Sequence, residues 1–69
     1  MNNFKIEYTI TNNKKSHMDF TSFESAKDIY ISLAYNLTIK KAKLYDLRNN
    51  KKILVEKFNK KRLYPLNEV

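Results

Sequence analysis

The residues that come closest to a chemical site are two carboxylates and the only imidazole of the chain. Glu7 and Asp19 lie in two neighbouring segments that alternate between apolar and polar residues, and His17 precedes Asp19 by two positions. If these segments pair with Tyr8 opposite Met18, Glu7 faces Asp19 on one surface. Such a group can bind a divalent metal or act as general acid and base. We interpret it instead as a solvated face of mixed charge, because an open sheet offers no concave pocket.

The other motifs of catalytic and cofactor-binding proteins are missing from the sequence. There is no Gly, so neither standard phosphate-binding glycine loop is present. There is no Cys and a single His, which excludes thiolate metal sites, the commoner zinc constellations and a Cys–His nucleophile pair. A chain of 69 residues also has little material with which to enclose a substrate. We therefore predict a protein that is not an enzyme, with no catalytic residue, cofactor or metal.

Charge is the clearest compositional signal. Fourteen Lys and Arg against seven Asp and Glu give a net charge of +7 at pH 7, which attracts nucleic acid, anionic membranes or acidic protein surfaces. Arg48 and Arg62 are the only arginines. Because specific base contacts favour Arg, the charge indicates electrostatic attraction more than sequence reading. Part of the Lys excess also fits the codon usage of an AT-rich genome, such as that of low-GC bacteria and their phages.

The composition also bears on compartment. A chain without Cys is suited to a reducing environment. No apolar run approaches the roughly 20 residues of a membrane span, and the first residues do not resemble a signal peptide. We expect one cytoplasmic domain over residues 1–69 that makes no contact with a membrane.

Periodicity predicts that a hairpin positions the carboxylates. Residues 4–11 alternate strictly and residues 16–20 continue the pattern after an Asn-rich turn, which is typical of two half-buried strands. A register with Ile6 opposite Phe20 keeps the apolar residues together.

A helix should follow over residues 22–36. Thr21 and Glu24 fit a capping box, and Asn36 can end the helix in the left-handed region. One apolar stripe runs along it, formed by Phe23, Ala26, Ile29, Tyr30, Leu33, Ala34 and Leu37.

Residues 39–47 and 52–58 read as a second hairpin around Asn49-Asn50, whose residue types suit a type I′ turn. This register pairs Leu44 with Val55 and Lys43 with Glu56, and it avoids a like-charge pair between Lys43 and Lys57. The predicted fold is α+β: ββαββ, an antiparallel four-stranded sheet with one helix packed on one face. Residues 59–69 form a tail that is first basic and then apolar, and we expect it to dock on the body.

One helix can cover only one face of the predicted sheet. If Ala42, Leu44, Ile53 and Val55 face the helix, an apolar cluster rimmed by lysines faces away from it, made of Tyr45, Leu47, Leu54 and Phe58 among Lys41, Lys43 and Lys52. Four interpretations stay open. The tail covers this face, two chains pair there as a homodimer, another protein docks on it, or its aromatic rings stack on bases of DNA or RNA.

A second candidate surface lies on the helix. Ile31 and Tyr35 are one turn apart and about opposite the core stripe, so they either anchor a partner or are two scattered surface residues.

These surfaces lead to two functional hypotheses. The first is a small accessory or inhibitor protein of phage or mobile-element type, which docks on a host protein or nucleoprotein complex. The alternative is a basic nucleic-acid-binding protein that uses a face rich in Lys, Tyr and Phe, with contacts from Lys41, Lys43, Lys52, Lys60, Lys61 and Arg62.

Overall fold

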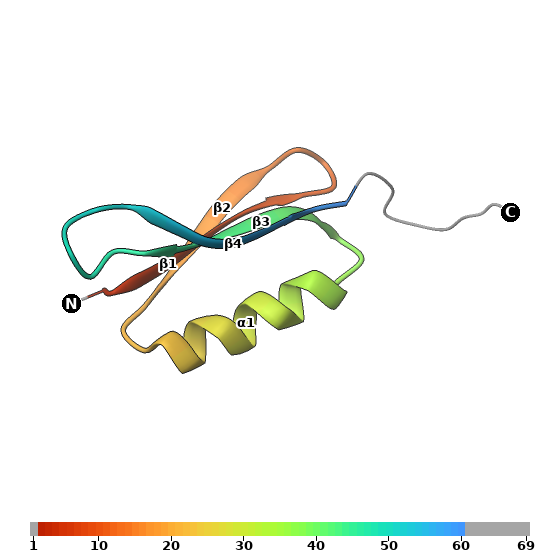
Figure 1. Ribbon diagram of the computed structural model, residues 1–69. Coiled ribbons are helices and arrows are strands. Elements are labelled where there is room, and N and C mark those ends of the chain that lie inside the picture. The colour runs from red at the N-terminus through yellow and green to blue at the C-terminus, as the bar shows by residue number, and fades with distance from the viewer. Residues whose placement is uncertain (1, 61–69) are drawn as a thin grey trace, which may run out of the picture.

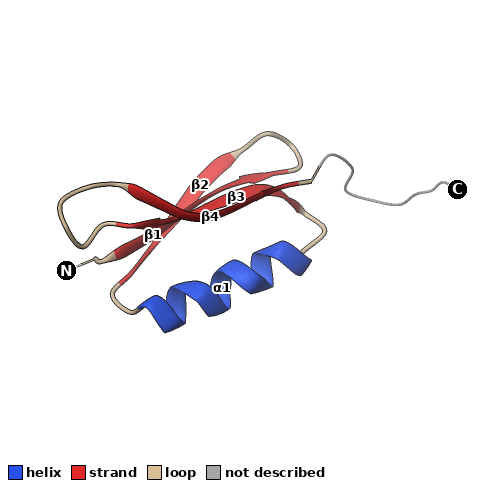
Figure 2. Ribbon diagram, in the orientation of Figure 1, coloured by secondary structure: helices blue, strands red, loops and turns tan. Residues whose placement is uncertain are grey.

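Four antiparallel strands and one helix follow one another in the order ββαββ in the computed structural model of the chain (Figures 1 and 2). This α+β fold confirms the predicted class. The structure describes residues 2–60, so most of the predicted tail, with Lys61 and Arg62, lies outside the described residues. The elements are β1 (Phe4–Ile10), β2 (Lys15–Phe20), α1 (Phe23–Tyr35), β3 (Ile39–Asp46) and β4 (Ile53–Asn59).

The sheet has the strand order β2-β1-β3-β4, so β1 and β3 are central and β2 and β4 form the edges. Both β2 and β3 are antiparallel to β1 and hence run in the same direction. The helix that joins them crosses one face of the sheet and leaves the other face open (Figure 1). It packs on β3, β1 and β2, whereas its contacts with β4 are fewer. The edge strand β4 is therefore the least covered part of the sheet.

The core lies between α1 and the two central strands. Ile6 and Leu44 face each other across β1 and β3 and are completely buried, which for side chains of this size contributes about 1.5–3 kcal/mol each. The other buried apolar residues are Phe4, Ala26, Tyr30, Leu33, Ile39 and Ala42.

The predicted stripe of the helix is correct in its middle and wrong at its ends. Phe23 is 45% exposed at the first helical residue, although its ring still packs 5.4 Å from that of Phe4. Leu37 is 61% exposed, because the helix ends at Tyr35 and the residues after it no longer follow the helical spacing that would bring Leu37 onto the buried stripe.

The first hairpin has a register two residues away from the predicted one. Ile6 lies opposite Met18 and Phe4 opposite Phe20. A shift by two leaves every side chain on the same face, so alternation alone cannot separate the two registers. The turn decides it. The N–H of Ile10 donates to the carbonyl of Lys14, and Asn13 takes a φ of 68°, which closes a short loop.

Both predicted helix caps are wrong. The N-cap is Ser22, whose Oγ accepts the N–H of Ser25 at 3.3 Å, so Glu24 comes one residue too early to complete a capping box with it. Asn36 is extended, with a φ of −87°, and not left-handed. Its side-chain oxygen accepts the N–H of Thr38 at 2.9 Å, which organises the turn into β3 without a positive φ.

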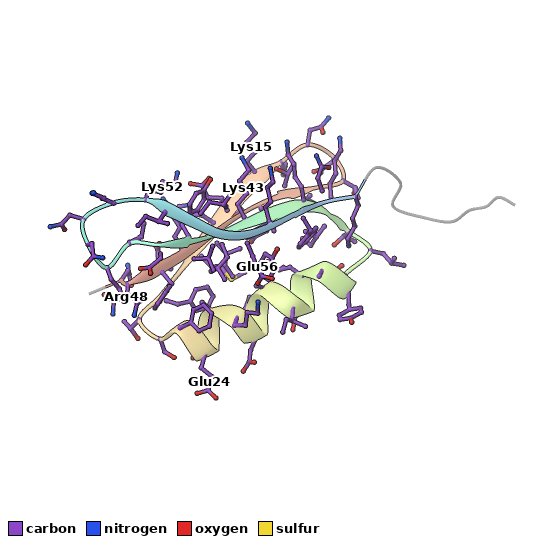
Figure 3. The ribbon with its side chains drawn as sticks, in the orientation of Figure 1. Lys15, Glu24, Lys43, Arg48, Lys52 and Glu56 are labelled. Atoms are coloured by element: carbon purple, nitrogen blue, oxygen red, sulfur yellow. The ribbon has the colours of Figure 1, made fainter. Side chains whose placement is uncertain are left out.

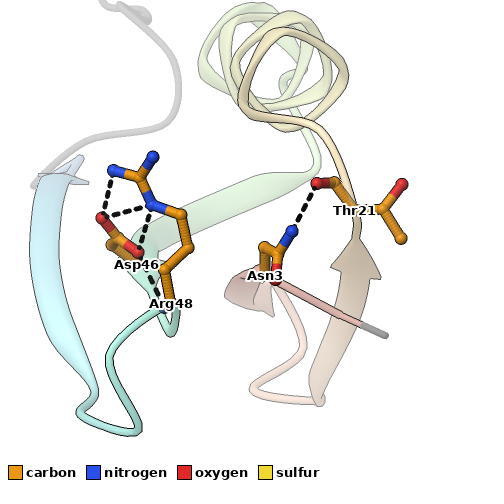
Figure 4. Close-up of polar contacts among 4 residues, drawn as sticks. All are labelled: Asn3, Thr21, Asp46 and Arg48. Carbon is orange, nitrogen blue, oxygen red and sulfur yellow. Dashed lines mark hydrogen bonds and ion pairs between the residues drawn. The ribbon is translucent and has the colours of Figure 1, made fainter.

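The second hairpin closes through residues 47–52 and not through a two-residue type I′ turn. Asn50 has a φ of 56°, but Asn49 does not have a positive φ. Asp46 organises the start of this loop: its carboxylate accepts the backbone N–H of Arg48 at 2.9 Å and also binds the guanidinium group (Figure 4). The Asp46 side chain thus stabilises a wider turn than the Asn-Asn pair indicates. At the open end of the first hairpin, the side-chain N–H of Asn3 donates to the carbonyl of Thr21 at 3.0 Å (Figure 4), and the backbone N–H of Leu47 donates to the carbonyl of Asn3 from the second hairpin.

A β-bulge at Val55 overturns part of the predicted pairing of β3 with β4. Tyr45 lies opposite Leu54 as expected, but Leu44 lies opposite Glu56 and Lys43 opposite Lys57. Val55 is therefore an extra residue in β4.

The bulge reverses the alternation beyond it and turns Phe58 toward the helix, where its ring lies 5.6 Å from that of Tyr30. The prediction that Phe58 points away from the helix is wrong. An aromatic pair contributes about 0.5–1.5 kcal/mol beyond its burial, which offsets the few tenths to about 1 kcal/mol that a like-charge pair costs. The Phe58–Tyr30 contact therefore outweighs the Lys43–Lys57 repulsion that the predicted register avoids.

Candidate functional site

The face of the sheet opposite α1, called the outer face from here on, consists of three rows of cross-strand neighbours. From β2 to β4 the rows read Asp19, Lys5, Tyr45, Leu54; then His17, Glu7, Lys43, Lys57; then Lys15, Thr9, Lys41, Asn59. Figure 3 shows Lys15, Lys43 and Lys52 on this side of the sheet, away from the helix. The outer face therefore carries many more lysines than carboxylates.

Each carboxylate of the outer face lies close to a basic group. The Nζ of Lys52 donates to Oε2 of Glu7 at 2.7 Å, and the Nζ of Lys5 lies 3.9 Å from the same oxygen. The hydrogen bond with Lys52 lowers the pKa of Glu7 from its ordinary value and raises that of Lys52. The Lys52 ammonium also lies 4.5 Å from the centre of the Tyr45 ring. Lys52 is thus held between Glu7 and Tyr45.

The predicted juxtaposition of Glu7 and Asp19 is wrong, because of the shifted register. His17 lies opposite Glu7, and Lys5 lies opposite Asp19. The Nε2 of His17 is 3.8 Å from Oδ2 of Asp19. Within residues 2–60, no group of three or more His, Cys, Asp or Glu side chains is placed to hold a metal ion.

Four lysines of the outer face, called the lysine quartet, are arranged differently: Lys15, Lys41, Lys43 and Lys57. In the part of the chain that the structure describes, none of them forms an ion pair with a carboxylate. Lys43 and Lys57 are direct neighbours across the ladder. Like charges in that position repel each other, so the quartet is a concentration of positive charge that the described residues do not neutralise.

The lysine quartet borders two shallow hollows of about 310 and 290 Å³. Lys15 lines the first and Lys57 the second, while Lys41 and Lys43 line both. Thr9, a short side chain that is only 8% exposed, lies between Lys15 and Lys41 in its row. The two hollows therefore adjoin and form a basic groove that runs across the strands from β2 to β4.

The structure brings together only some of the residues that the sequence singles out. Lys41, Lys43, Tyr45 and Leu54 share the outer face, with Lys52 beside them. Others lie elsewhere. Phe58 faces the helix, Leu47 is half-buried in the loop after β3, and Ile31 and Tyr35 are exposed on the helix, which covers the opposite face of the sheet.

Lys60 also lies apart from the quartet. Its Nζ donates to the carbonyl of Asn36 at 2.9 Å, at the C-terminal end of α1. A lysine at this end satisfies a free helix carbonyl and interacts favourably with the helix dipole. Lys60 therefore has a structural role at the end of the helix. Lys61 and Arg62, the other two tail residues predicted to contact nucleic acid, lie outside the described residues.

Sequence reasoning missed two members of the quartet, Lys15 and Lys57. Lys15 had been assigned to the turn, although β2 begins with it. An unbroken ladder would place Lys57 on the helix side of β4, and only the bulge turns it outward. The one signal for its true position is Phe58, whose large aromatic ring favours the core and thereby turns the preceding residue outward.

The opposite side of the molecule has a different charge. Glu24 and Asp28 are exposed on α1, and Glu24 lies on the far side of the helix from the labelled lysines of the sheet (Figure 3). Lys27 of the helix is paired with Glu56. The protein thus presents a basic outer face and a partly acidic helix.

Comparison of the chain with protein-family models, with curated proteins and with solved structures found no match. Within residues 2–60, no helix is both long enough and apolar enough to cross a membrane.

Proposed function

We propose that the protein is a small, non-enzymatic binding protein whose outer face binds nucleic acid through the phosphate backbone. The lysine quartet supports this proposal, because its four lysines border the groove and form no ion pair among residues 2–60, while Glu7, the carboxylate that lines the groove, is bound to Lys52. A polyanion in the groove would replace the repulsion between Lys43 and Lys57 by attraction. In nucleic-acid binding, lysine ammonium groups bind chiefly to the phosphate oxygens of the backbone.

The same residues support backbone contacts more than base reading. A lysine carries a flexible point charge and does not provide the planar fork with which Arg reads guanine. Tyr45 is the one aromatic residue of the three rows on the outer face, and the ammonium group of Lys52 lies over its ring. Base stacking would require Lys52 to leave Tyr45 and Glu7. We therefore expect weak preference for sequence.

A salt titration with matched lysine variants tests this proposal. The Lys41→Gln/Lys43→Gln double variant should bind a labelled single-stranded oligonucleotide about tenfold more weakly at low salt. Its plot of log affinity against log salt should be shallower by about 1.4, because about 0.7 is lost per phosphate contact on a single strand. Fluorescence anisotropy at several salt concentrations gives both quantities.

The control is Lys14→Gln/Lys51→Gln, which removes the same charge from two exposed residues outside the quartet, in the loops between the strands. It should keep most of the affinity and of the salt slope. Equal losses in both double variants would mean that net charge alone attracts the oligonucleotide. An affinity that does not change with salt would contradict phosphate binding altogether.

We also infer a second candidate function, that of an accessory or inhibitor protein of phage or mobile-element type that docks on a host protein or nucleoprotein complex. What favours it is a run of three exposed apolar residues at the start of the edge strand β4, two residues before Lys57 of the lysine quartet.

A further inference from the structure

The two edges of the sheet differ in how well they are protected. Edge β2 carries charged or ionisable residues at alternate positions, and Met18 and Phe20 on its other face pack against the core. Helix α1 also contacts β2. Charged side chains and covering elements are the means by which proteins prevent an edge from pairing with another chain. By this criterion β2 is a protected edge.

Edge β4 has a bulge at Val55, which is another such means, but it carries no charged side chain over residues 53–55. Ile53, Leu54 and Val55 follow one another and are 47%, 44% and 41% exposed. We call these three residues the apolar strip. Three consecutive strand residues cannot all point into one core: Ile53 lies opposite Asp46, Leu54 lies opposite Tyr45 on the outer face, and Val55 is the bulged residue. None of the three belongs to the core cluster.

We propose that the free edge of β4 binds an extended acidic segment of a partner protein, which adds to the sheet as a fifth strand. This inference deepens the second candidate function, docking on a protein, and does not depend on nucleic-acid binding. Backbone hydrogen bonds along a free edge supply affinity for an added strand, and the alternate side chains supply selectivity. The partner's apolar side chains would cover the apolar strip.

Charge determines which strand fits. Lys51 precedes the strip and Lys57 follows it, and neither forms an ion pair among the described residues, whereas Lys52 binds Glu7 and Lys60 binds the carbonyl of Asn36. The one acidic residue in between, Glu56, is already paired with Lys27 of the helix. An acidic strand would meet lysines at both ends of the edge. A second copy of this chain would instead bring the same lysines together and add its own charge of +7, so the charge disfavours a dimer through β4.

The experiment uses a short labelled peptide in which glutamate alternates with valine. In NMR titrations of the full chain, we expect backbone shifts and slowed amide exchange in β4, with little change in β2. The Val55→Asn variant should weaken binding about tenfold, because it replaces an apolar contact at the edge by a polar side chain and leaves the charge unchanged. Val55 is half-exposed, so the fold should persist, which circular dichroism checks.

The matched control is Ile31→Asn, since Ile31 is 44% exposed on the helix. It should leave peptide binding unchanged. Shifts confined to other elements, equal loss in both variants, or a dimer that sedimentation detects and Val55→Asn abolishes would each overturn the proposal. A host protein that crosslinks only to the helix would also overturn it, although it would still support docking on a protein. Nucleic-acid binding should survive Val55→Asn, which leaves the charge unchanged and so keeps the two proposals separable.

Discussion

At the scale of single residues, two asparagines do the work that glycine does in most turns. The chain has no Gly, and the residues with positive φ within the described range are Asn13 and Asn50, at 68° and 56°. Asn tolerates this region because its short polar side chain can hydrogen-bond to the local backbone. Each hairpin therefore depends on one asparagine for its closure.

Asn50 and its neighbour Asn49 should respond differently to substitution. Asn50→Ala should lower the free energy of unfolding by about 1 kcal/mol, because the left-handed conformation is less favourable for alanine than for asparagine. Asn49→Ala should change it little, and Asn50→Gly should restore most of the loss. Urea denaturation followed by circular dichroism measures all three. Equal effects at the two positions would indicate a turn in which both have positive φ.

At the scale of elements, the start of α1 distinguishes two adjacent hydroxyl residues. Ser22→Ala should cost about 1 kcal/mol of unfolding free energy, because the N–H of Ser25 loses its acceptor. Thr21→Ala should cost much less, since the contact of Thr21 with Asn3 uses its backbone carbonyl. Thermal or urea unfolding of both variants is a sufficient measurement. A larger loss from Thr21→Ala would assign the N-cap to Thr21 instead.

Periodicity predicts the elements of this chain well because it reports which face of a strand is buried. Phe4 and Ile6 alternate with polar residues, and that pattern alone places β1 in the sheet. It does not report register, because a shift by two preserves every face. The lysine quartet depends on register, and so it could be predicted only in part: Lys41 and Lys43 were found.

The bulge was beyond prediction for a different reason. It depends on the packing of Phe58 against Tyr30, a contact between residues far apart in the sequence. Local alternation gives no warning of a contact that forms only in the folded chain. If Val55 were paired in an unbroken ladder, Lys57 would not join the outer face.

At the scale of the whole molecule, the excess of positive charge makes the few carboxylates important for stability. Hydrogen bonds with Lys52 and Arg48 lower the pKa values of Glu7 and Asp46, respectively, below their ordinary values of 4.5 and 3.8. A carboxyl whose pKa is lower in the folded state stabilises the fold above its unfolded pKa. That contribution is lost as the pH falls through the folded pKa, while the net charge rises.

We therefore expect the melting temperature to fall as the pH is lowered from 6 to about 2.5. Glu7→Gln should melt below the unmodified protein at pH 6, and the two should converge at the acid end. The control is Asp28→Asn, because Asp28 is exposed on α1 and forms no ion pair within the described residues. Calorimetry at several pH values measures the differences. A Glu7→Gln difference that persists at low pH would show that it does not arise from the carboxylate charge.

The bulge at Val55 can also be viewed as an insertion in evolution. Deleting Val55 would place Leu54 next to Glu56 and restore an unbroken ladder with β3. Lys57 and Phe58 would keep their present faces, so the quartet and the core would both survive the deletion. A homologue that is one residue shorter at this point would then retain the basic groove but lose a third of the apolar strip. Such a gap in an alignment would separate the two binding surfaces in a natural sequence.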